Sequence, residues 1–280
     1  MKQVILALAV SALFLAGLAG CQPSDKPHAT PAANADPTPV LSRIAERGEV
    51  VVGMTGDMPP FNMRNKEGQV IGFEADMARY VAEGMSVKLR IEAMDFADLI
   101  PALESGKIDM IISNMTMTPE RNLKIAFVGP YFSSGKCFLT KQKHIAESQQ
   151  PKTVIGADVK LTALAGSTSE AFARSVFPES QLTSAPSYDA AVKMVLEDQA
   201  HALVADFAIC MVSLLRYPDA GFVSSFTPLT FEPLGVALPA GDPLLVNWME
   251  NFLAMLTATG RMEELEDRWL ENAAWLEQLP

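Results

Sequence analysis

Histidine and cysteine are scarce in this sequence, with three of each among 280 residues. The histidines (His28, His144 and His201) stand apart from one another and from the cysteines, so the sequence lacks the spacing of a metal site. Phosphate-loop and nucleophile–base motifs are also missing, and we expect neither a metal nor a cofactor. Positive charge is in short supply, because 22 lysines and arginines oppose 33 acidic residues and give a net charge of -11. This balance argues against nucleic acid and against an anionic membrane surface as partners.

Long apolar runs are absent except near the start, where residues 4–18 are almost wholly aliphatic after a basic residue. The run is too short for a stable membrane span and is typical of a secretory signal peptide, which we place at residues 1–20. It ends in Leu18-Ala19-Gly20-Cys21, which resembles the bacterial lipobox. We therefore predict that Cys21 is lipidated and anchors the protein to a membrane, in the periplasm or at the cell surface. The alternative is a plain signal peptide with an incidental cysteine.

Residues 21–40 are predicted to form a disordered tether, because they are rich in Pro, Ala, Asp, Asn and Thr and have little to bury. About 240 residues remain, which is enough for one large domain or two lobes. Within them, Cys137 and Cys210 are far apart in the sequence and have apolar neighbours. They would be able to pair in an oxidising compartment, but we expect two separate buried thiols.

The folded part alternates between strand-like and helix-like segments. In its first half we expect strands at 50–54, 87–93 and 108–113, with helices at 73–83, ended by Gly84, and at 95–104, capped by Asp95. In its second half we expect strands at 153–157, 160–165, 202–205 and 235–238, with helices at 169–177, 187–198, 207–216, 243–259 and 262–273. Such alternation predicts an α/β fold with mainly parallel sheets.

One candidate site residue is Arg121, which comes just after a predicted buried strand. Thr118 is a suitable N-cap, and Pro119 suits the first position of a short helix, which places Arg121 in its first turn. A guanidinium at the carboxyl end of a strand matches a carboxylate with two hydrogen bonds. An exposed arginine in a solvated turn is the alternative.

Two further candidates follow later strands. Ser167 and Glu170 have the spacing of a capping box, which leaves backbone amides near Thr168 at the positive end of a helix, suited to an anion. Asp206 ends a predicted strand, where its carboxylate would balance an ammonium group or cap the next helix.

Ordered motifs extend over residues 46–272. They are Val51-Val52-Gly53-Met54, Pro60-Phe61, Gly72-Phe73-Glu74-Ala75-Asp76-Met77-Ala78, Asp95-Phe96-Ala97-Asp98-Leu99, Gly106-Lys107-Ile108-Asp109, Met115-Thr116-Met117-Thr118-Pro119-Glu120-Arg121, Gly166-Ser167-Thr168, Asp206 and Gly260-Arg261-Met262. This series resembles the bacterial extracellular solute-binding proteins, family 3, of the polar amino acid transport type. The resemblance implies an α/β, two-lobed periplasmic-binding-protein fold of type II, with a two-segment hinge. Residues 41–138 plus 231–280 would form lobe 1, and residues 139–230 would form lobe 2.

The same resemblance implies roles for individual residues. Arg121 would bind the α-carboxylate of an amino acid, helped by backbone amides near Asn114 and Thr168. Asp206, the Thr116 hydroxyl and the Ser113 carbonyl would hold the α-ammonium group.

Two departures from the family pattern bear on the ligand. Met58 stands where relatives commonly carry an aromatic ring, and Thr55 stands where relatives that bind cationic side chains often carry Asp. Asp57 is nearby but out of register, so the resemblance makes a basic ligand less expected. Phe96 matches a position that flanks the ligand and, with Met58, would form a partly apolar wall, whereas Phe61 is expected in the core.

The resemblance implies a monomer that binds a small solute, an amino acid or a related molecule, and delivers it to an ABC transporter permease by hinge closure. It implies a binding protein rather than an enzyme. The first alternative is a periplasmic dehydratase-type enzyme for a cyclic carboxylic acid, with Asp57, Glu74 and Asp206 as the available acids or bases. The second is a ligand-sensing lipoprotein.

Overall fold

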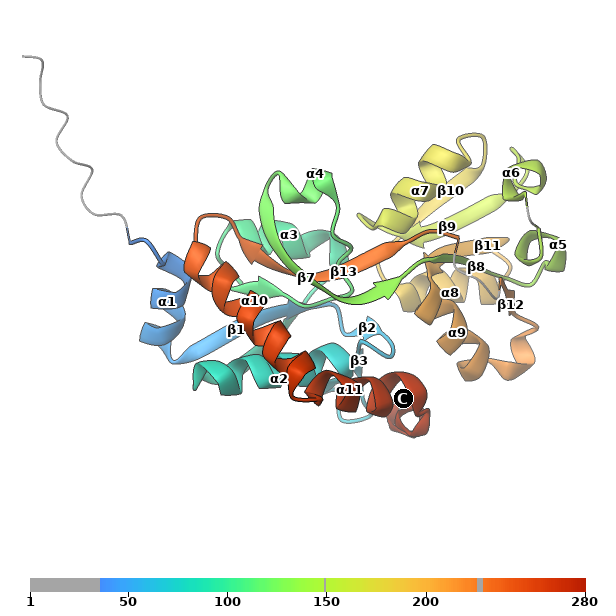
Figure 1. The fold of residues 1–280 in the computed structure, drawn as a ribbon. Helices are drawn as coiled ribbons and strands as arrows, with labels where there is room; N and C mark the ends of the chain where they lie inside the picture. Colours follow the sequence, from blue (N-terminus) through green and yellow to red (C-terminus); the bar gives the residue numbers. More distant parts are fainter. Residues whose placement is uncertain (1–35, 149, 226–228) are drawn as a thin grey trace, which may run out of the picture. The chain divides into compact units, whose positions relative to one another are not determined.

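The computed structural model describes residues 36–148, 150–225 and 229–280 (Figure 1). The predicted signal peptide, Cys21 and the first part of the predicted tether lie outside the described residues. Folded structure begins earlier than predicted, because α1 (Pro39–Arg47) starts inside the expected tether. Its Val40 and Ile44 are buried, and the Asp242 carboxylate accepts the Val40 backbone N–H at 2.9 Å. Across the described ranges, no helix is long and apolar enough to cross a bilayer.

The first lobe is built on a mixed sheet of five strands in the order β5-β1-β6-β13-β7. These strands are β1 (Glu49–Met54), β5 (Lys88–Ala93), β6 (Met110–Ile111), β7 (Ile125–Ser134) and β13 (Glu232–Pro239). The first three run parallel, and β13 is antiparallel to both of its neighbours. Val50 and Val52 join the apolar cluster that includes α2 (Phe73–Met85) and α10 (Pro243–Ala258), while Val51 joins the cluster of α3 (Phe96–Glu104). Burial on both faces explains the unbroken run of valines in β1.

The second lobe repeats this plan with the order β10-β9-β11-β8-β12. Its strands are β8 (Lys136–Thr140), β9 (Lys160–Leu164), β10 (Gln181–Ala185), β11 (Ala202–Asp206) and β12 (Val223–Ser224). The longer helices of this lobe are α7 (Thr168–Val176), α8 (Tyr188–Leu196) and α9 (Phe207–Arg216). Strands β9, β10 and β11 are parallel, and β8 is antiparallel to β11 and β12. Both sheets are therefore mixed, with a parallel part of three strands each.

Shorter elements complete the two lobes. They are β2 (Asp57–Met58), β3 (Asn62–Arg64), β4 (Val70–Ile71), α4 (Pro119–Asn122), α5 (Lys143–Ala146), α6 (Pro151–Val154), α11 (Arg261–Glu266), a π-helical turn (Asp267–Glu271) and two 3-10 turns (Pro218–Ala220 and Ala274–Gln278).

The chain crosses between the lobes twice. It leaves the first sheet with β7 and enters the second at Lys136, so the change of sheet falls at Gly135, and it returns through β13 (Figure 1). The two crossing segments lie side by side, because Ser134 of β7 is paired with Glu232 of β13 and the Leu229 N–H donates to the Lys136 carbonyl at 2.8 Å. Two adjacent connections of this kind form the hinge of a two-lobed protein.

Several predicted elements differ from the structure. Helix α2 continues through Gly84 and ends at Met85, where Ser86 takes the left-handed conformation with a φ of 56°. The strand predicted at 153–157 is wrong, because Pro151 starts the short helix α6 there. The helix predicted at 262–273 ends sooner, as α11 gives way to the π-helical turn.

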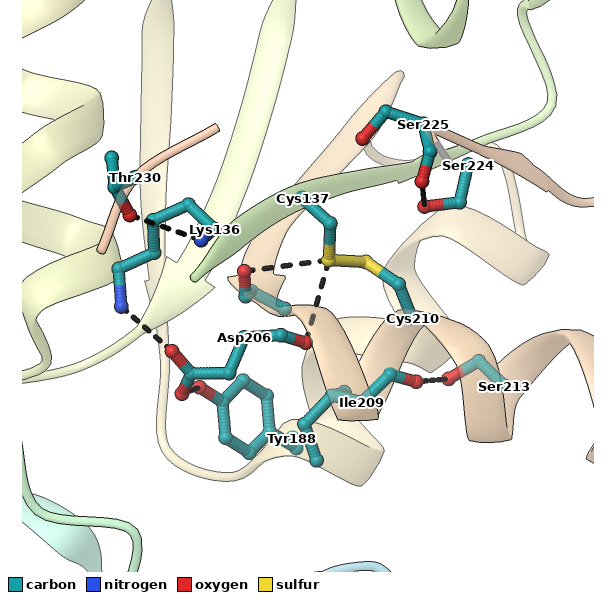
Figure 2. The surroundings of a disulfide bond; sticks show 11 residues. Lys136, Cys137, Tyr188, Asp206, Ile209, Cys210, Ser213, Ser224, Ser225 and Thr230 are labelled. Atoms are coloured by element: carbon teal, nitrogen blue, oxygen red, sulfur yellow. Dashed lines mark hydrogen bonds and ion pairs between the residues drawn. A yellow bond between two sulfur atoms is a disulfide. The ribbon is translucent and has the colours of Figure 1, made fainter. Parts of the chain in front are cut away.

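The prediction of two separate thiols is also wrong, because Cys137 and Cys210 form a disulfide within the second lobe (Figure 2). Cys137 of β8 is paired with Ala205 of β11, and α9 follows β11 directly along the chain. The first turn of α9 therefore returns beside β8, which brings Cys210 next to Cys137. Both residues are fully buried. Their separation of 73 residues in the sequence hid this contact.

We expect the double substitution Cys137→Ala/Cys210→Ala to lower the free energy of unfolding by roughly 4 kcal/mol, because the disulfide closes a long loop in the unfolded chain. Urea unfolding followed by circular dichroism measures this difference. The natural protein provides a second test, because a reductant reaches the buried disulfide once the chain is unfolded. After reduction, its urea midpoint of unfolding should be lowered by the same amount. An unchanged midpoint in both samples would show that the disulfide does not contribute to stability.

Candidate functional site

The predicted site residues follow the carboxyl ends of strands, where open α/β sheets bind ligands. Ser113, Asn114 and Thr116 follow β6 of the first lobe, whereas Thr168 opens α7 and Asp206 ends β11 in the second lobe. Direct contacts join the two groups. The Asn114 side-chain amide donates to Asp206 Oδ2 at 2.8 Å, and the hydroxyls of Thr116 and Thr168 are 3.3 Å apart. The structure thus brings Asn114 and Thr116 of the first lobe into contact with Asp206 and Thr168 of the second.

Arg121 reaches the same region from α4. The Thr118 hydroxyl caps this helix by accepting the Arg121 N–H at 3.2 Å, with Pro119 at the first helical position, as predicted. The guanidinium donates to the carbonyl of Thr116 at 2.8 Å and to that of Gly166, in the second lobe, at 3.2 Å. Burial lowers the pKa of Arg121, while the charges of Asp206 and Glu232 raise it. A cation held in this way suits a carboxylate ligand.

Phe96 and Met58, the two residues predicted to form an apolar wall, lie in different surroundings. The Phe96 ring faces the Arg121 guanidinium, whose central carbon is 5.5 Å from the ring centroid, and it lines a cavity of about 320 Å³. Met58 is buried in the apolar cluster with Phe96 and is not among the residues that line this cavity. Phe61 is fully buried and packs edge-on against Phe73, in the core as expected.

The N-terminus of α7 differs in one detail from the predicted capping box. Ser167 Oγ accepts the Glu170 N–H at 3.1 Å, as expected, but the Glu170 carboxylate accepts the N–H of Gly166 at 2.7 Å instead of that of Ser167. The Thr168 hydroxyl accepts a hydrogen bond from the ammonium group of Lys136 at 2.7 Å and donates to Glu232 at 3.1 Å. Thr168 therefore belongs to a charged cluster as well as to the helix terminus.

Asp206 occupies the N-cap position of α9, but its side chain makes no capping bond there. Its carboxylate instead turns toward Lys136 and Tyr188, as Figure 2 shows. Oδ1 accepts from Lys136 Nζ at 2.7 Å, and Oδ2 accepts from the Tyr188 hydroxyl at 2.9 Å and from the Asn114 amide. Of the two interpretations that the sequence leaves open, the structure favours the charge-balancing one.

Lys136 is the main site residue that the sequence analysis missed. Its side chain is fully buried, and its ammonium group contacts Asp206 and, at 3.3 Å, Glu232 of β13. A buried ammonium group is costly unless it is paired and hydrogen-bonded. The signal in the sequence was a lysine followed by Cys137-Phe138-Leu139, an apolar run typical of a buried strand. The cluster holds two carboxylates and one ammonium group, so it carries one excess negative charge.

A second buried carboxylate, Glu74, orients the loop that carries Asn114. Glu74 accepts the Asn114 backbone N–H at 2.5 Å, the Asn62 side-chain amide at 2.5 Å and the Tyr131 hydroxyl. The Asn114 N–H that was predicted to bind the ligand thus has a partner within the protein. Asn114 itself has a φ of 49°, a left-handed conformation that asparagine tolerates better than most residues. Burial raises the pKa of Glu74 to about 7, against the opposing effect of its three donors.

Ser113 lies under this loop. It is fully buried, and its hydroxyl accepts the Thr55 N–H at 3.1 Å. Among the described residues, no group of three or more histidines, cysteines and carboxylates is placed to hold a metal ion.

This geometry, with opposed charges at the facing strand ends of two hinged lobes, defines a periplasmic-binding-protein fold of type II. Residues 50–272 match the model of the bacterial extracellular solute-binding proteins, family 3, and the chain belongs to that family. Similar solved structures support the fold. A putative ABC transporter binding component from Wolinella succinogenes, complexed with lysine, is 35% identical with a TM-score of 0.78, over 82% of this chain and 99% of that one.

Relatives at lower identity differ in their named functions. The glutamine-binding protein of an ABC transporter from Bacillus subtilis is 28% identical over 236 residues, which cover 83% of this chain and 85% of that protein. A cyclohexadienyl dehydratase from Pseudomonas aeruginosa is 25% identical over 82% of this chain and 86% of the enzyme. The family thus includes an enzyme beside its binding proteins.

The buried Glu74 makes the stability of the folded protein depend on pH. Its carboxyl group has an ordinary pKa of 4.5 in the unfolded chain and a pKa of about 7 in the folded protein. Between these values the folded state holds a proton that the unfolded state releases, so this group lowers stability as the pH rises from about 4.5 to about 7. We expect Glu74→Gln to lack this part of the pH dependence. The difference between the urea midpoints of unfolding at pH 5 and pH 8 measures this pH dependence. Glu104→Gln, which changes an exposed glutamate, is the control. The prediction is wrong if the natural protein and both variants show the same difference.

Proposed function

We propose that this protein binds an amino acid outside the cytoplasm and delivers it to an ABC transporter by hinge closure. The observation that carries the proposal is the pair of opposed charges at the lobe interface, Arg121 from the first lobe and Asp206 from the second. The family membership supports solute binding, and the relatives named for glutamine and complexed with lysine support an amino acid as the solute.

In this proposal the α-carboxylate of the ligand binds Arg121 and the amide end of α7 at Thr168. The α-ammonium group binds Asp206, together with the Thr116 hydroxyl and the Ser113 carbonyl. The charge count supports this arrangement, because Asp206 and Glu232 outnumber Lys136 by one negative charge. A carboxylate offers about four acceptor sites. Asp206 uses three of them for protein donors, which leaves room for a ligand N–H.

Hinge closure follows from the position of the two anchors. A ligand that touches both lobes binds the closed form better than the open form and shifts the equilibrium between them. The contacts that already join the lobes, from Asn114 to Asp206 and from Arg121 to Gly166, are the ones that such a ligand would replace or reinforce. Micromolar affinity corresponds to about −8 kcal/mol, which two charge-assisted anchors in a closed site can provide.

The remaining parts of the proposal concern location and partners. The protein is exported by the signal peptide at residues 1–20, is anchored through lipidated Cys21, and acts as a monomer with an ABC transporter permease. The two lobes that move are those expected at residues 41–138 plus 231–280 and 139–230, with the first boundary shifted to Gly135, where the chain changes sheets.

We propose a binding protein rather than a dehydratase, although the named dehydratase relative shares the fold. Of the three carboxyl groups available for acid–base chemistry, Glu74 and Asp206 have both oxygens engaged by protein donors. Such groups are poorly placed to transfer a proton to a substrate. Elimination of water from a cyclohexadienyl carboxylic acid by the purified protein would overturn this part of the proposal.

The carboxylate anchor is tested by Arg121→Ala. We expect amino-acid affinity to fall by about 100-fold or more, because two charge-assisted hydrogen bonds are lost. Isothermal titration calorimetry after a thermal-shift screen of the amino acids measures the loss. The matched control is Arg90→Ala, which removes a half-exposed arginine from β5, at the edge of the first-lobe sheet. This variant should bind the ligand normally. If both variants bind the amino acid with equal affinity, Arg121 does not bind the ligand.

A further inference from the structure

Asp57 carries a buried carboxylate oxygen without a hydrogen-bond partner among the described residues. It opens β2 in the first lobe and faces α8 in the second, where its Oδ2 accepts the Tyr188 backbone N–H at 2.7 Å. The other oxygen, Oδ1, is the unpartnered one. Burial has the largest effect on the pKa of Asp57 and raises it, whereas the Thr55 side chain and the Tyr188 backbone N–H lower it. A buried acceptor left without a donor is costly, which points to a donor that comes from outside the chain.

A cavity of about 320 Å³ lies beside Asp57. Its wall includes Thr55, Asp57 and Phe96 from the first lobe and Pro186 and Ser187 from the second. Phe96 is the ring that lies against the Arg121 guanidinium. Phe96 therefore has the Arg121 guanidinium against its ring and the cavity at its side, and Asp57 lines the same cavity.

Tyr188 sets the separation between Asp57 and Asp206. Its backbone N–H donates to Asp57, and its hydroxyl donates to Asp206. The two carboxylates thus lie at opposite ends of one tyrosine residue. The stem of an extended lysine or arginine spans a comparable length, so one ligand of this kind reaches both carboxylates.

The balance of charge points to the same class of ligand. With the charged residues that line the cavity included, Arg121, Lys136, Arg64 and Arg216 supply four positive charges, and Asp206, Glu232, Asp57, Asp95 and Asp189 supply five negative charges when ionised. A zwitterionic head group is neutral and leaves one negative charge uncompensated. A cationic side chain compensates it at Asp57.

We propose that Asp57 is the specificity-determining residue of the site and accepts a hydrogen bond from the cationic end of a basic amino acid. This inference rests on the proposed function, and it concerns a position different from Thr55, where relatives that bind basic ligands often have Asp. Thr55 donates its hydroxyl to Asn62 at 3.0 Å, so its side chain is part of the loop structure. Asp57 lies two residues further along the same segment and lines the cavity.

The test compares ligands that differ only in side-chain charge: arginine against citrulline, and lysine against norleucine. In the full protein we expect arginine and lysine to bind about tenfold or more tightly than their neutral partners, the effect of one charge-assisted hydrogen bond. In Asp57→Asn this preference should disappear, with affinity for citrulline within about threefold of its original value. Asparagine keeps an oxygen that accepts the Tyr188 N–H, so the lobe contact at α8 is retained.

Asp98→Asn is the matched control, because it removes an exposed carboxylate of the same lobe that does not line the cavity, and it should keep the preference for arginine. If wild-type protein binds amino acids through Arg121 but does not distinguish arginine from citrulline, or if Asp57→Asn keeps the distinction, the role of Asp57 is refuted and the proposed function stands. If no amino acid binds at all, the proposed function fails first, and this inference fails with it.

Discussion

The fully buried ammonium group of Lys136 constrains the centre of this molecule. A charge removed from water has to be paired, and its partners come from three separate segments: Asp206 at the end of β11, Glu232 at the start of β13 and Thr168 at the start of α7. Because Lys136 begins β8, directly after the chain changes sheets, the cluster ties both crossing segments to the binding elements of the second lobe. Removing both carboxylates would leave an unpaired charge at the hinge.

The first lobe uses a buried carboxyl group in a similar way. Glu74 lies under the loop after β6 and accepts donors from Asn62, Asn114 and Tyr131. It thereby fixes the backbone that presents Asn114 to Asp206 in the opposite lobe. Each lobe thus contains a fully buried ionisable side chain whose hydrogen bonds position residues at the lobe interface. The apolar clusters on either side of each sheet supply the rigidity that lets such an arrangement persist.

Local signals in the sequence predicted the parts of the structure that depend on neighbours in the chain. The valines of β1, the Thr118 cap before Arg121 and the Ser167 cap of α7 all lie where these signals place them. The resemblance to a family supplied the two-lobed fold, and the structure places Asn114 of the predicted site in contact with Asp206. The unpredicted features depend on contacts between distant segments, which no local pattern encodes. Lys136 has partners 70 and 96 positions away, and Cys137 has a partner 73 positions away.

The pairing of β7 with β13 has a mechanical consequence. Two separate linkers would allow the lobes to swing and twist in several directions, whereas a hydrogen-bonded ribbon bends readily only out of its own plane. The register from Ser134 and Glu232 onward joins the two connections near the point where the chain changes sheets. Relative motion of the lobes is then reduced to something close to rotation about a single axis. A protein with one such degree of freedom presents a single geometry to its partner each time it closes.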